Sequence, residues 1–151
     1  MGLEYGLELS TDLGPTQALR LLAERLGLPW GNERSLRGSA LWIDLSEPSN
    51  TGREIIEEGF HFRPDVLVIF RLDSNSDQYE EGHRVMLRAT MLLLEHGRDG
   101  VLLFNGERII LQRLAGELVL NADYGNWTKG LQLENEIQLP HEKRPLPSPL
   151  L

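Results

Sequence analysis

The chain has 151 residues, 40% of them apolar, and a formal net charge of −8 at pH 7. That size suits one domain with one ordinary core, and the absence of cysteine excludes disulfides, thiol catalysis and cysteine-ligated metal sites. The negative charge disfavours nucleic acid as a partner. The lack of an export signal at the start, and of any apolar run near the ~20 residues that span a bilayer, predicts a cytoplasmic protein without membrane insertion.

Two elements are predicted at the start of the chain. Apolar side chains alternate with polar or small ones over residues 3–9, which is typical of a half-buried strand. Pro15, apolar residues at helical spacing and then Gly27 predict a helix over residues 15–26. Proline suits the first turn of a helix, and glycine suits the residue after its end.

The following segment is less regular. A polar link over residues 29–38 leads into a second predicted strand over residues 40–45. Residues 53–58 are compatible with a short helix. The glycine and aromatic residues that come next, up to Pro64, favour a bend or a loop.

The middle of the chain contains the clearest strand and the longest helix. Five consecutive apolar residues over 66–70, mostly β-branched or aromatic, predict a central strand covered on both faces. Beyond a polar turn, apolar residues recur at helical intervals until Gly97. We therefore predict a second long helix over residues 78–96.

A β-hairpin with Asn105 and Gly106 as its two-residue loop is predicted between two apolar segments, residues 101–104 and 109–111. Asparagine and glycine both tolerate the positive φ that a tight hairpin turn requires. A second turn at Ala115-Gly116 leads into residues 118–120, so the hairpin extends into a three-stranded meander.

The predicted fold is α+β, with the order β-α-β-β-α-β-β-β. It is a mainly antiparallel sheet with two helices on one face, similar to a split β-α-β unit with a C-terminal meander. Residues 131–139 are compatible with one more strand. Four prolines over residues 140–151 predict an extended tail behind a single domain of residues 1–139.

The sequence contains no pattern typical of a reactive site. The four histidines form no His-x-His or His-x-x-x-His pair, and no phosphate-binding glycine loop is present. Glu80 and His83 share one helix face at the spacing of half a di-iron motif, but such a site needs a second pair. His61, between two phenylalanines, is the residue around which an enzyme site would be sought. We predict no catalytic residue, no metal and no cofactor.

Several segments together resemble a known family. They are the opening strand of residues 3–9, the helix near 15–26, the strand 66–70 with the phenylalanine-containing link before it, and the meander of residues 99–107 and 117–121. Over roughly residues 3–127, this pattern resembles the Sit-type immunity proteins, specifically their third class. These small proteins protect myxobacteria and other bacteria from swarming-inhibition toxins that kin deliver by outer-membrane exchange.

The resemblance implies an immunity protein that binds and neutralises a cognate bacterial toxin without catalysis. An acidic surface would attract such a toxin if the toxin is basic. The acidic residues predicted to bind it flank the strand 66–70: Glu54, Glu57, Glu58, Asp73, Asp77, Glu80 and Glu81. The alternative that the residues leave open is a small cytosolic enzyme or ligand-binding domain whose site is assembled from distant positions.

Overall fold

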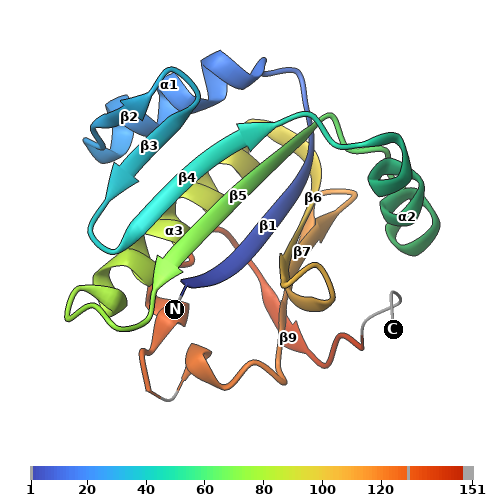
Figure 1. Cartoon of the computed structure of the whole chain (residues 1–151). Coiled ribbons are helices and arrows are strands. Elements are labelled where there is room, and N and C mark those ends of the chain that lie inside the picture. Colours follow the sequence, from blue (N-terminus) through green and yellow to red (C-terminus); the bar gives the residue numbers. More distant parts are fainter. Residues whose placement is uncertain (1, 129, 148–151) are drawn as a thin grey trace.

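The first strand of the chain lies in the middle of the sheet (Figure 1). In the computed structural model, which describes residues 2–128 and 130–147, β1 (Gly2–Thr11) pairs antiparallel with β5 (Val66–Asp73) on one side and β6 (Gly97–Phe104) on the other. Because β5 and β6 both run against β1, they are parallel to each other. The long helix α3 (Tyr79–Glu95) connects them across β1.

The remaining strands extend the sheet on both sides. Beyond β5 lie β4 (Leu41–Ser46), β3 (Ser35–Gly38) and β2 (Trp30–Asn32). Beyond β6 lie β7 (Arg108–Leu114), β8 (Glu117–Asn121) and β9 (Glu142–Arg144). The pairings are antiparallel except that of β8 with β9, which is parallel. The predicted α+β class with a mainly antiparallel sheet is thus confirmed.

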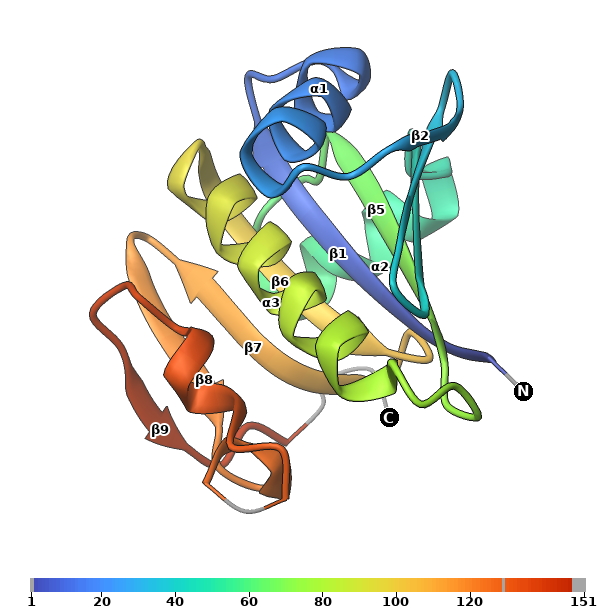
Figure 2. The same ribbon diagram turned by 90° about the vertical axis from the view of Figure 1, so that its left-hand side faces the viewer.

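Two helices, α1 (Pro15–Leu26) and α3, cover one face of the sheet (Figure 2). Their apolar stripes pack on the inward side chains of the central strands, and Leu22, Met86 and Phe70 are fully buried there. Gly27 ends α1 in the left-handed conformation, with φ 65°, as its position after the helix predicted. The second predicted long helix is also confirmed.

A third helix, α2 (Asn50–Phe60), corrects the prediction of two helices on one face. It lies against the opposite face, where Ile56 and Phe60 join a second apolar cluster with Val101 and Leu103 of β6. Only these two side chains of α2 are buried, and the glycine and aromatic residues after Glu58 limited the predicted helix to residues 53–58. The Ser49 hydroxyl caps its start by accepting the Gly52 N–H at 3.0 Å.

Two other segments also differ from the predicted order. The expected link over residues 29–38 contains β2 and β3, and the Asn32 side chain accepts the Arg34 N–H at 2.8 Å in the turn between them. The expected strand over residues 131–139 is instead a short 3-10 helix, η2 (Leu133–Glu136), whose Leu133 is fully buried. The alternating apolar residues in this segment therefore belong to a turn of 3-10 helix and its flanks, and not to a strand.

Both predicted hairpin turns have the backbone that their residue types favour. Asn105 and Gly106 have φ values of 53° and 74°, and Ala115 and Gly116 have 53° and 80°. The Glu107 N–H donates to the Phe104 carbonyl at 3.1 Å and closes the first turn. The connection spans residues 105–107, so the predicted two-residue loop is wrong by one residue.

The C-terminal segment is fastened to the sheet through one asparagine side chain. Asn121 Nδ2 donates to the carbonyls of Ile109 at 2.7 Å and Leu146 at 3.2 Å, and its Oδ1 accepts the Leu146 N–H at 3.1 Å. Leu146 is buried in the second cluster with α2. The division into a domain of residues 1–139 and a tail of 140–151 stays a prediction, and β9 and Leu146 fall within that tail.

Replacing Gly106 with alanine tests the hairpin turn. A Cβ at Gly106 meets no neighbour, so any loss of stability comes from the left-handed backbone, which costs about 1 kcal/mol for a residue with a Cβ. We expect Gly106→Ala to lower the free energy of unfolding by about that amount in urea denaturation. Gly125→Ala is the matched control, because Gly125 also has open space and no positive φ. Equal stability of the two variants would contradict the assigned turn.

Candidate functional site

One face of the sheet is left without a helix over β1, β3, β4 and β5, and we call this surface the open face. Burial alternates along these strands: the odd-numbered residues of β4 are buried under α1 and α3, while Trp42 and Asp44 point to the other side. In Figure 1, α3 lies behind these strands and α2 stands to one side, over β6. The strand of residues 66–70 is therefore only half covered here, contrary to the prediction, and Leu67 and Ile69 are partly exposed.

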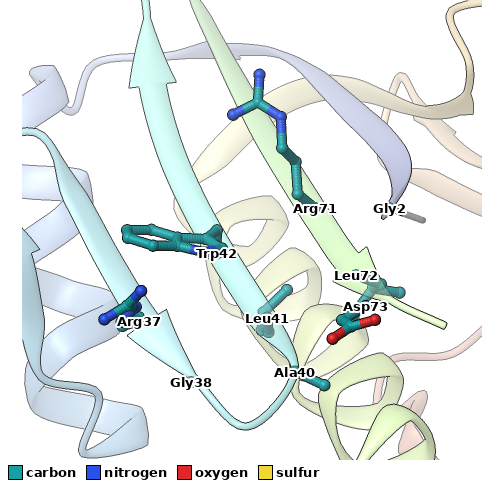
Figure 3. A pocket seen from close by; sticks show the side chains of 9 residues that line it. All are labelled: Gly2, Arg37, Gly38, Ala40, Leu41, Trp42, Arg71, Leu72 and Asp73. Carbon is teal, nitrogen blue, oxygen red and sulfur yellow. The ribbon is translucent and has the colours of Figure 1, made fainter. Parts of the chain in front are cut away.

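A shallow hollow of about 360 Å³ lies on the open face, where β3 and β5 end and β4 begins (Figure 3). The guanidinium of Arg37 lies 4.1 Å from the centre of the Trp42 ring, a cation–π arrangement. Trp42 is nevertheless 37% exposed. Figure 3 shows Arg71 standing on the next strand, so two arginines and a tryptophan occur on three adjacent strands.

Arg71 links this hollow to β1. Its Nη1 lies 2.7 Å from a carboxylate oxygen of Asp44, and its Nε lies 3.8 Å from one of Glu4. All three side chains are at least a third exposed, so these pairs contribute little to stability. Their effect is to hold Arg71 across the middle of the open face.

A smaller hollow of about 130 Å³ is lined in part by Glu4, the ion-pair partner of Arg71, and we call it the Glu8 hollow. Leu67, Ile69 and Leu103 supply apolar walls, and Gly106 of the hairpin turn forms part of its rim. The remaining lining residues lie on one side of β1: Glu4, Gly6 and Glu8. Its lining contains two carboxylates and no basic side chain.

Glu8 has an unusual environment for an acidic residue. Its Oε1 atom is shielded from solvent and has no hydrogen-bond partner among the described residues. Glu8 lies in register between Leu67 and Val101 on the neighbouring strands, and this burial raises the pKa of its carboxyl from 4.5 to about 7. An unpaired buried polar atom costs about 1–3 kcal/mol, so the position is unfavourable for folding.

The seven acidic residues predicted as a contact surface are all exposed, but they form two separate groups. Glu54, Glu57 and Glu58 lie on α2, before β5 begins, whereas the others lie where β5 ends and α3 starts. The length of β5 therefore separates the groups (Figure 1). Within the second group, Glu80 pairs with Arg84 at 3.6 Å and Glu81 with Arg88 at 3.4 Å.

The histidines considered at the sequence level occupy structural positions. His61 is exposed and ends α2 with a left-handed φ of 64°. His83 is fully buried, and its Nε2 lies 2.8 Å from the Tyr124 hydroxyl, while Glu80 faces solvent. Burial lowers the pKa of His83 to about 4. Within residues 2–128 and 130–147, no group of three or more His, Asp or Glu side chains is placed to hold a metal ion.

The sequence did not predict that Glu8, Trp42 and Arg37 line hollows on the same side of the sheet. The alternation over residues 3–9 placed Glu4 and Glu8 on one side of a strand, which was the only available signal. The alternation did not indicate that β5 and β6 would flank β1 and partly bury Glu8, because the order of strands in a sheet depends on contacts between residues distant in sequence. The cation–π pair likewise requires β3, which the sequence did not predict.

Comparison with known proteins identifies the family. The sequence profile of the SitI3-like family matches residues 3–131. The chain belongs to the SitI3-like family of Sit immunity proteins. The matched range contains every strand of the sheet except β9, and both the open face and the Glu8 hollow. No curated protein and no solved structure matches the chain.

The helices were also compared with the requirements of a membrane span. In the part of the chain that the structure describes, none has the length and apolar content needed to cross a bilayer. The longest helix, α3, has 17 residues, and its apolar stripe is occupied by the core.

The raised pKa of Glu8 predicts a pH-dependent stability. Between about pH 4.5 and 7, the unfolded chain has lost the Glu8 proton and the folded chain has kept it, so the free energy of unfolding falls as the pH rises through this window. Glu8→Gln has no proton to lose. We expect the free energy of unfolding of Glu8→Gln, measured by urea denaturation, to exceed that of the wild type by about 1–3 kcal/mol at pH 8. At pH 4.5 the two values should be similar.

Glu4→Gln is the control for this measurement, because Glu4 lies on the same strand and side but is exposed. Other titrating groups, including His83, are common to all three proteins and cancel in the differences. A difference between Glu8→Gln and wild type that does not change with pH would contradict the assigned burial of Glu8.

Proposed function

We propose that this chain is an immunity protein that neutralises a cognate bacterial toxin by binding it, without catalysing a reaction. The observation that carries the proposal is the family match over residues 3–131, which covers nearly the whole sheet. Proteins of this type act by forming a complex, so a binding surface is the site to be sought.

The open face has the composition of a protein-binding surface. Tryptophan and arginine are enriched among residues that dominate binding energies, and Trp42, Arg37 and Arg71 lie together on it. Its strands are held by a core on their other side, so the side chains are presented on a rigid support. We propose the open face as the surface that contacts the toxin.

The exposed acidic residues are proposed to guide the encounter. With a net charge of −8, the chain attracts a basic partner over distances of about the Debye length, 8–10 Å at ordinary salt. The group on α2 and the group at the start of α3 flank the open face along β5. Their separation favours a role in steering over a role as one compact binding patch.

Co-expression tests the proposed function directly. The gene adjacent to the one for this chain is expected to encode a toxin, and cells that express this toxin should survive only when the chain is also present. Purified chain should retain the toxin in a pull-down. A toxin that neither binds the chain nor is neutralised by it would overturn the proposal.

Charge reversal on α2 tests the steering role. We expect Glu57→Lys/Glu58→Lys to slow association with the toxin about tenfold at low salt, with little change in dissociation, since screened surface charges act mainly on the encounter. Stopped-flow or surface-based kinetics at two salt concentrations measure this. Glu24→Lys/Glu95→Lys makes the same change in net charge at exposed positions on α1 and α3. Equal slowing by both variants would show that only net charge matters and would contradict a role for α2.

A further inference from the structure

The Glu8 hollow combines three features that the fold itself does not need. It contains a carboxyl group in the middle of the sheet, it has apolar walls, and it opens on the face opposite α1 and α3, beside the cluster that α2 covers. The core, in contrast, lies on the other side of β1, where Tyr5, Leu7 and Leu9 are buried. The hollow is therefore unexplained by packing.

The unpaired oxygen of Glu8 points to a missing donor. Oε1 is shielded from solvent and accepts no hydrogen bond among the described residues, while Glu8 as a whole is partly exposed and lines the hollow. Arg71, a basic side chain on the open face, is engaged by Asp44 at 2.7 Å. No basic residue lines the hollow, so the chain does not neutralise Glu8 itself.

The shape and chemistry of the hollow fit one long basic side chain. Lysine and arginine have an apolar stem that packs against residues such as Leu67, Ile69 and Leu103, and a charged end that pairs with a carboxylate. A volume of about 130 Å³ holds one such side chain and no larger element. The net negative charge of the chain also favours a basic partner.

Gly6 keeps the hollow open. It lies between Glu4 and Glu8 on the same side of β1, and a Cβ built on it would lie 3.4 Å from Leu67 Cδ1, an ordinary contact. A larger side chain therefore fits the backbone here but would occupy the hollow. The absence of a side chain at this position is what leaves space for a ligand.

We propose that the Glu8 hollow receives a lysine or arginine side chain of the toxin and that Glu8 pairs with its charged end. This inference rests on the proposed function and names the anchor point of the complex. A carboxyl that is costly when alone becomes favourable when a partner supplies the donor, so its burial is explained by the complex.

Binding of the inactivated product of the adjacent toxin gene tests the proposal by calorimetry. We expect Glu8→Gln, which keeps the shape of the side chain, to raise Kd at least tenfold, and Gly6→Val, which fills the hollow, to do the same. Gly125→Val is the matched control, since Gly125 is exposed after β8, outside both the open face and the Glu8 hollow, and a Cβ built on it meets nothing within 4 Å. We expect this control to bind within twofold of wild type.

Two readouts separate the possible outcomes. Because the proposed pair is buried, the loss caused by Glu8→Gln should persist at high salt, whereas the loss caused by reversing Glu57 and Glu58 should shrink. If the wild type binds and Glu8→Gln binds equally well, the hollow is not the anchor, while the proposed function stands. If the wild type does not bind the toxin, the proposed function fails, and this inference with it.

Discussion

The position of β1 between β5 and β6 is the constraint on which the rest of the structure depends. The first strand of the chain supplies hydrogen bonds to both neighbours and so joins the two halves of the sheet. Successive side chains of β1 point to opposite faces of the sheet, so each face receives a different set of residues. Tyr5, Leu7 and Leu9 enter the core under the helices, while Glu4, Gly6 and Glu8 shape the open face. A shift of one residue in register would exchange these two sets and bury both carboxylates in the core.

Helix α3 and two small polar networks fix the C-terminal half to this centre. The buried His83 on α3 meets the Tyr124 hydroxyl, which lies 3.4 Å from that of Tyr5 on β1. Asn121, at the end of β8, binds both the Leu146 backbone and the carbonyl of Ile109. Each network joins segments that are far apart in sequence. The irregular region after β8 is therefore held by specific contacts, even though it has little regular structure.

The sequence predicted the parts of the fold that depend on residues close together in the chain. The turns at Asn105-Gly106 and Ala115-Gly116, the cap at Gly27 and the two long helices follow from residue type and spacing within a few positions. The hairpin of β2 and β3 and the strand β9 were not predicted, and α2 was predicted only as a short helix over residues 53–58, because tertiary contacts stabilise these segments. The acidic residues were recognised individually, but whether they share a surface depends on strand order. The Glu8 hollow could not be foreseen for the same reason.

The two edges of the sheet are both very short strands, and this limits how a partner can recognise the molecule. β2 and β9 have three residues each, so neither offers a long row of free backbone groups for pairing with another chain. Backbone pairing is nearly independent of sequence, whereas contact through a sheet face depends on individual side chains. Substitutions at outward positions of β1, β4 and β5 leave the buried side chains of those strands unchanged. Partner preference can thus diverge among related chains while the shared fold is preserved.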